Sequence, residues 1–352
     1  MISLLVTLLT WIFRSQLIGI LFGSAEKKVI SNAYAYMSIT LITYPLITID
    51  LISNGILRGA GDTKTPMKIV IFMNIINVIF TYSFINIFKL GVEGAALGIA
   101  VARSIGAIII LFVLIRGSRI IKLTKLRKFS FNRELLKSIY GIGIPASIES
   151  LLFNGGKLIT QIYIVDMGTI ALAANAVAGS IANMLNVPGN ALCTAATAMV
   201  GQHMGKNQKK EAKGTLSYIT KLSTVSLVLV AVVFLPFATI ISSLYTNNKD
   251  IIHLSANILR ANAIFIPTWS LSFVLPSGLK GAGDAKYTLV TTFIGMWVFR
   301  ITLGYLLAIP LKLGLMGVWL GMFIDWAVRG VLYYMRFKSG KWQNHDVIKR
   351  AV

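Results

Sequence analysis

The stretch Ile56–Lys64 (ILRGAGDTK) returns 222 residues later as Gly278–Lys286 (GLKGAGDAK). Each copy ends a long apolar run, and Pro45 and Pro267 stand at the same distance before the Leu-Arg/Lys-Gly step of the two copies. Because both copies close their apolar runs in the same direction, the repeat is parallel and not inverted. In a membrane protein, a parallel repeat indicates two homologous lobes related by an axis along the membrane normal.

The composition is that of an integral membrane protein. Of the 352 residues, 56% are hydrophobic and 13% are charged, which is about half the charged share of an ordinary soluble domain. The mean hydropathy is +0.76, and a soluble fold could not bury so much apolar surface. These values exclude a secreted scaffold, a disordered chain and a soluble enzyme. Cys193 is the only cysteine, so no intrachain disulfide can form.

Long apolar stretches fill most of the chain. A helix needs about 20 mostly apolar residues to cross the hydrocarbon core of a bilayer. Ten stretches have this character, and we expect an all-α protein of about ten transmembrane helices. They are residues 1–22, 32–57, 66–89, 91–116, 139–165, 171–200, 215–245, 253–277, 288–309 and 314–336.

Lysine and arginine concentrate in alternate loops. One set of loops, with the C-terminal tail, holds 22 of the 34 basic residues, whereas the opposite set holds 5. Basic loops remain in the cytoplasm, so both termini are predicted to be cytoplasmic. The formal net charge of +22 is therefore mainly a topology signal, and no nucleic-acid partner is expected.

The two lobes differ in length. We predict a four-helix N-terminal lobe at 1–116, a basic cytoplasmic linker at 117–138, a six-helix C-terminal lobe at 139–336 and a basic cytoplasmic tail at 337–352. Subtracting the repeat offset from residue 139 places the expected start of the first lobe about 80 residues before Met1. The sequence thus predicts that two helices of a six-plus-six pattern are missing from the front.

Three motifs carry a resemblance to a known family. Leu57–Met67, Ile144–Phe153 and Ala171–Gln202 resemble the signature segment, the seventh helix and the eighth helix of the multidrug and toxic compound extrusion (MATE) transporters. The resemblance implies twelve helices in two lobes around a cleft, of which this chain lacks the first two. It also implies export of cationic or amphipathic compounds in exchange for Na⁺ or H⁺.

Glu149 is the leading candidate for cation coupling. An ionisable group inside a membrane helix is costly and asks for a function, and Glu149 lies near the expected middle of its span, four residues after Pro145. A carboxylate there can bind a proton or a Na⁺. The resemblance carries the role of the family's seventh-helix glutamate onto Glu149. The alternative is a structural carboxylate neutralised by Lys157 or another buried base.

Polar side chains recur at helical spacing around this position and on the next helix. They are candidates for lining a cation or substrate site, although Asn and Thr in membrane helices also serve to join helices. The candidates are Asn154, Lys157, Asn175, Asn183, Asn186 and Asn190, with Trp269 as an aromatic wall for flat compounds.

Two further acids have structural alternatives. Asp50 in the first lobe could be a coupling site or could pair with Arg103 or Arg14. Asp325 and Arg329 stand four residues apart on one helix and are expected to neutralise each other.

The function expected from these features is secondary active multidrug export, and no enzyme activity, metal or cofactor is expected beyond the coupling ion. The glycine motifs lack the Gly-Lys-Ser/Thr of a phosphate-binding loop. The alternatives are a lipid-linked oligosaccharide flippase of the same superfamily, for which Arg103, Arg260 and Arg300 would supply basic groups, and an inactive truncated remnant. We expect a monomer in a bacterial plasma membrane that exchanges small molecules across the lipid bilayer.

Overall fold

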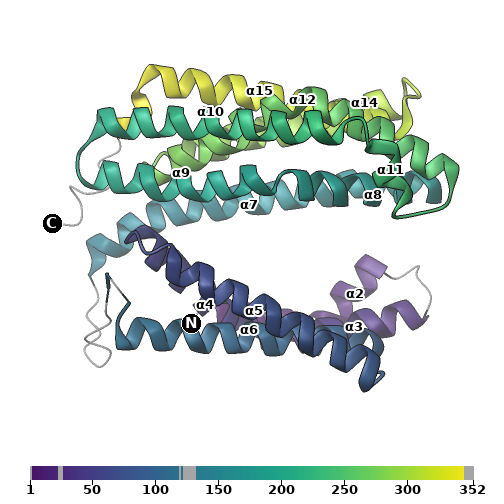
Figure 1. Cartoon of the computed structure of the whole chain (residues 1–352), viewed down its shortest axis with the longest axis horizontal. Helices are drawn as coiled ribbons and strands as arrows, with labels where there is room; N and C mark the ends of the chain where they lie inside the picture. Colours follow the sequence, from purple (N-terminus) through teal and green to yellow (C-terminus); the bar gives the residue numbers. More distant parts are fainter. Residues whose placement is uncertain (1, 23–26, 119, 122–131, 345–352) are drawn as a thin grey trace. The chain divides into compact units, whose positions relative to one another are not determined.

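The computed structural model describes residues 2–22, 27–118, 120–121 and 132–344. It divides the chain into two compact units, Met1–Ser130 and Phe131–Val352. Both are built from helices in the described residues (Figure 1). The division falls within the predicted linker at 117–138, much of which lies outside the described residues, as does the end of the predicted tail.

The first unit contains six α-helices and one π-helical segment. Helix α6 lies at its centre and packs against α3, α4 and α5. Its buried face is mainly Gly and Ala, which lets neighbouring backbones approach closely. The elements are α1 (Ile2–Ile12), α2 (Arg14–Phe22), α3 (Lys27–Ile42), α4 (Tyr44–Gly59), α5 (Lys64–Tyr82), the π-helix η1 (Ser83–Ile87) and α6 (Gly91–Arg116).

The second unit is organised around α12, which contacts α8, α9, α10 and α15. Long helices run side by side through this unit in Figure 1. The elements are α7 (Arg133–Asp166), α8 (Thr169–Leu185), α9 (Val187–Gly205), α10 (Lys209–Phe234), α11 (Ala238–Ser243), α12 (Lys249–Gly281), α13 (Ala285–Phe293), the π-helix η2 (Ile294–Leu303), α14 (Gly304–Ala308), α15 (Gly314–Ser339) and the 3₁₀ turn η3 (Lys341–Asn344).

All ten predicted spans are helical, but fewer qualify as membrane spans by length and composition. Among the described residues six helices qualify, or eight if each bent pair is one span. The stretch 1–22 is broken at Phe13 into two short helices, and α7 carries too many polar and charged side chains. The multi-pass helical class is confirmed, whereas the estimate of ten spans is higher than this count.

Prolines lie at the two sharp bends. Helices α3 and α4 meet at 52°, just before Pro45, and α8 and α9 meet at 51°, just before Pro188. Proline lacks a backbone N–H and disfavours helix at the preceding residue. Helix α12, the repeat partner of α3 and α4, nevertheless continues through Pro267 and Pro276.

The C-terminal boundary also differs from the prediction. Helix α15 extends to Ser339 and ends where Gly340 adopts a left-handed conformation at φ 68°, which glycine tolerates best. Beyond it, Trp342 is fully buried and stacks on Phe337. The first part of the predicted tail, residues 337–344, is therefore packed onto the second unit.

Candidate functional site

Glu149 occupies the middle of α7, a helix that begins earlier than expected. The Asn132 side chain accepts hydrogen bonds from the backbone N–H groups of Glu134 and Leu135 and so caps the helix at Arg133. Residue 149 lies beside the last turn of α12, which carries Lys280, and beside α13, which carries Thr288 and Thr292.

Three donors hold the Glu149 carboxylate. The Lys280 ammonium lies 3.2 Å from Oε1, and the Thr292 hydroxyl donates to the same oxygen over 3.2 Å. The Thr288 hydroxyl donates to Oε2 over 2.9 Å. Lys280 belongs to the repeated glycine motif, so this segment supplies the base that neutralises Glu149. Lys157, the base named from the sequence, makes no ion pair with it in the described residues.

The donors around Glu149 are tied into the surrounding helices. The hydroxyls of Thr292 and Tyr333 lie 3.0 Å apart, and Tyr333 donates to the Thr288 carbonyl over 3.2 Å. The network joins α7, α12, α13 and α15. The Glu149 side chain is 12% exposed and that of Lys280 is 31% exposed, so this pair is only partly buried within the second unit.

Asp325 forms a second, fully buried acid site. Arg329 donates from Nε and Nη2 to its two oxygens over 2.5 and 2.9 Å, and Arg300 Nη1 lies 3.9 Å away. The predicted mutual neutralisation of Asp325 and Arg329 is confirmed. Asp325 is thus neutralised inside the second unit by arginines.

A cavity of about 480 Å³ opens within the second unit. Helices α7, α8, α9, α12 and α15 and the π-helix η2 contribute its walls. Six of the eight candidates named from the sequence line it, namely Lys157, Asn175, Asn183, Asn186, Asn190 and Trp269; it is also lined by Phe153, Thr160, Gln161, Ile164, Gly179, Ala182, Phe273, Arg300, Val318, Trp319, Met322 and Trp326.

The other two candidates lie elsewhere. Asn154 is exposed on α7 and bonds back to the Ser150 carbonyl. Asp50 belongs to the first unit, where the Asn54 amide donates to its backbone carbonyl. Among the described residues no ion pair joins Asp50 to Arg103 or Arg14, and Arg14 donates to the Tyr34 hydroxyl instead.

Aromatic rings form one wall of the cavity. Trp269 and Phe273 stack with centroids 4.6 Å apart, and Trp326 meets Phe273 edge to face. Trp319 donates to the Asn175 side chain, which in turn donates to Gln161 over 3.4 Å. Flat surfaces of this kind, with a few fixed polar groups, are typical of small-molecule sites.

The charges on the cavity wall are positive. Lys157 Nζ lies 4.8 Å and the Arg300 guanidinium 5.8 Å from the centroid of Phe153. None of the residues that line the cavity carries a carboxylate. The wall therefore lacks the acidic group that a cationic compound would be expected to meet.

Sequence reasoning missed several of these residues. Lys280 and the two threonines approach Glu149 from segments more than 130 positions away, and no local pattern shows this pairing. Trp319 reads as an interface or packing residue from the sequence, although it lines the cavity. Arg300, by contrast, was named from the sequence, since a basic residue inside an apolar span requires a buried partner or a functional role.

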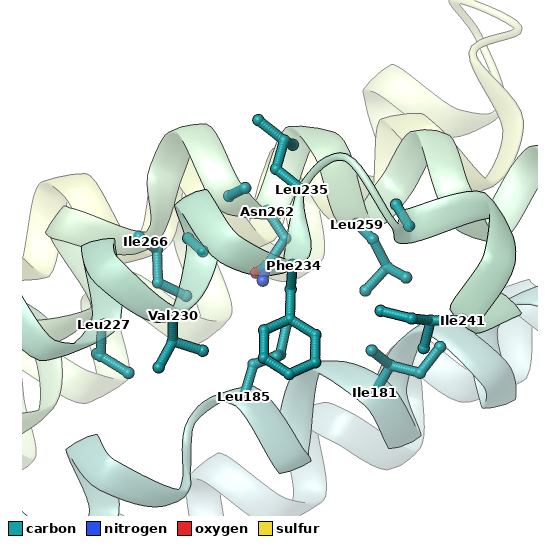
Figure 2. A pocket seen from close by; sticks show the side chains of 13 residues that line it. Ile181, Leu185, Leu227, Val230, Phe234, Leu235, Ile241, Leu259, Asn262 and Ile266 are labelled. Atoms are coloured by element: carbon teal, nitrogen blue, oxygen red, sulfur yellow. The ribbon is translucent and has the colours of Figure 1, made fainter.

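A second cavity, of about 20 Å³, is almost entirely apolar (Figure 2). It lies between α8, α10, α11 and α12, and Asn262 is its polar lining residue. Both side-chain polar atoms of Asn262 lack a hydrogen-bond partner in the described structure. Its volume suits about one water molecule, so it is too small to hold a substrate.

The long apolar helices define a multi-pass helical membrane protein with a cavity inside its second unit. The sequence model described as MatE matches residues 1–83 and 145–306. The chain belongs to the MatE family, as the sequence motifs predicted.

Known proteins of this family resemble the chain over most of its length. It is 26% identical to "Probable multidrug resistance protein NorM" of Thermotoga maritima, across 94% of this chain and 72% of that protein. It is 30% identical to "Uncharacterized transporter YisQ" of Bacillus subtilis, across 82% of this chain and 64% of that protein. A solved MOP superfamily transporter from Pyrococcus furiosus is 24% identical with a TM-score of 0.88, across 97% of this chain and 77% of that one, and shows the shared fold.

Proposed function

We propose that the protein is an ion-coupled exporter of small amphipathic compounds. The compound would occupy the cavity lined by α7, α8, α9, α12 and α15, and Na⁺ or H⁺ would bind at Glu149. The names of the NorM relatives support multidrug export. No cofactor beyond the coupling ion takes part in the proposal.

The observation that carries the proposal is the position of Glu149 relative to the cavity. Its carboxylate is held by one exchangeable cation, Lys280, and by two hydroxyl groups. Phe153, one helical turn further along α7, lines the cavity. An incoming cation must displace the Lys280 ammonium. The resulting rearrangement of α7 would shift the Phe153 side chain on the wall of the cavity where the compound binds.

Such an arrangement can couple two ligands only if their affinities differ between states. The paired state described here has Glu149 neutralised by Lys280. A state with Na⁺ or H⁺ on Glu149 frees Lys280 and its neighbours on α12 to move. Differential affinity for the compound then arises from the α7–α12 contact.

Uphill transport in proteoliposomes tests the proposal. The purified chain is reconstituted, a Na⁺ or pH gradient is imposed, and the movement of ethidium and of naphthalene-2-sulfonate is followed. We expect one of the two gradients to drive uphill movement of at least one dye. Glu149→Gln should reduce it to the level of protein-free vesicles, whereas Glu211→Gln, which changes an exposed acid at the start of α10, should not. If neither the Na⁺ gradient nor the pH gradient moved either compound uphill, the exporter would be refuted.

The flippase alternative finds less support in the structure. Of the three arginines considered for a pyrophosphate, Arg300 lines the cavity. Arg260 is exposed and bonded to Asn257 and Thr239, and Arg103 belongs to the first unit.

A further inference from the structure

We infer that the cavity of the second unit binds an amphipathic organic anion, with an acidic head group on a flat aromatic body. This inference names a substrate class for the proposed exporter. Transport of the anion rests on the proposed function, whereas binding of the anion does not. Binding can be measured independently of any gradient.

The first argument is the balance of charge inside the unit. Lys280 neutralises Glu149, and Arg329 neutralises Asp325. The basic residues that line the cavity are Lys157 and Arg300. Arg300 lies 3.9 Å from Asp325, but this single carboxylate faces both Arg300 and Arg329, so one positive charge of the three groups is left over. Among the described residues Lys157 makes no ion pair.

The second argument is the inventory of hydrogen-bonding atoms. Arg300 Nε and Trp326 Nε1 are buried and have no acceptor in the described structure. Both atoms can only donate, as can the Lys157 ammonium. Acceptors are also present on this wall, since Asn186 Oδ1 is buried without a partner in the described structure and the amides of Asn183 and Asn190 line the cavity. The two charged groups of the wall are donors only, so they favour a ligand rich in acceptors, as a carboxylate, sulfonate or phosphate is.

The third argument concerns the aromatic faces. A cationic compound could in principle bind over aromatic rings, but the protein's own cations already occupy two of them. Lys157, Arg300 and Arg329 lie 4.8, 5.8 and 5.6 Å from the Phe153 centroid, and Arg329 lies 5.0 Å from that of Phe273. The tryptophan rings offer stacking area for a flat body, while the basic groups repel a positive one.

A pair of probes with the same ring and opposite charge tests the inference. Naphthalene-2-sulfonate and 2-naphthyl-trimethylammonium are titrated into the purified full-length chain in detergent, and calorimetry gives the two dissociation constants. We expect the sulfonate to bind more tightly. Lys157→Gln should weaken sulfonate binding roughly tenfold or more, the effect of losing one charged hydrogen bond, and Lys157→Arg should retain it.

Arg260→Gln is the matched control, because it removes one intramembrane arginine of the same unit outside the cavity. Thermal melting of each variant verifies folding. Tighter binding of the ammonium probe, or equal effects of Lys157→Gln and Arg260→Gln, would overturn the inference and leave the exporter standing. Lys157-dependent sulfonate binding without uphill transport of either probe would overturn the exporter and leave the anion site standing.

Discussion

Two acids of the second unit differ in how tightly they are held. Asp325 has no exposed side-chain area and both of its oxygens bonded to Arg329, whereas Glu149 is partly exposed and has one lysine partner. Both groups pair with a base, but only the Glu149 pair is partly exposed. We therefore propose Glu149, and not Asp325, as the carboxylate that exchanges cations.

Asp325→Asn should destabilise the protein because it leaves Arg329, and Arg300 beside it, as buried charges without a counter-ion. The expected cost is about 3–5 kcal/mol, seen as a lower melting temperature in detergent. Glu149→Gln serves as the comparison, since the partly exposed Lys280 can be solvated when its partner is lost. Equal melting temperatures for the two variants would contradict this distinction.

Replacement of Asn262 should stabilise the protein, in contrast to replacement of Asp325. Its amide is 1% exposed and lacks partners inside the apolar cavity of Figure 2. An unpaired buried amide costs about 1–3 kcal/mol, so Asn262→Leu should raise the melting temperature. Asn257→Leu, on the exposed side of α12, should produce no increase. A lower melting temperature for Asn262→Leu would show that the amide has a partner.

At the scale of helices, two glycines spaced four residues apart allow close helix packing in each unit. A Cβ at Gly321 would lie 2.6 Å from the Cα of Gly304, and one at Gly98 would lie 2.8 Å from the Cα of Thr81. The positions correspond within the repeat at an offset of 223, one residue more than the offset of the glycine motif. Gly94 and Gly317, four residues earlier, make the same close approach to their neighbours. The duplicated Gly-xxx-Gly spacing therefore fixes how the last helix of each unit packs on the helix before it.

Gly321→Ala should lower the stability of the second unit, because the added methyl meets backbone that cannot rotate away. Overpacking of this kind typically costs about 1–3 kcal/mol. Gly155→Ala is the matched control, since a Cβ there meets nothing within 4 Å and alanine favours helix. Thermal unfolding of the two variants measures the difference, and equal melting temperatures would refute the packing role.

Helices were predictable from apolar length, but their breaks were not. Pro45 and Pro188 coincide with bends, whereas Pro267 and Pro276 lie inside one helix. The same residue type thus gives different results, because neighbouring helices decide whether the lost hydrogen bond is tolerated. Asn183, Asn186 and Asn190 could be grouped from their helical spacing alone, although the segment bends at Asn186. The pairing of Glu149 with Lys280 required the tertiary fold.

For the whole molecule, the distribution of basic residues predicts which loops face the cytoplasm. Cys193→Ser gives a chain without cysteine, into which single cysteines can be introduced. Asn207→Cys, in a basic loop, should be shielded from a membrane-impermeant maleimide in intact cells, whereas Asn247→Cys should react. Permeabilised cells provide the control for reactivity, and the reverse labelling pattern would contradict the assigned orientation.

The bend between α8 and α9 is a point where a bound molecule can change the angle between two helices. Asn186, whose oxygen has no partner, stands at this bend and on the wall of the cavity. Helix α12, which packs against both α8 and α9, is continuous past this bend. A molecule that bonds to Asn186 therefore contacts the chain where the two helices meet, and can bias the angle between them without unfolding either.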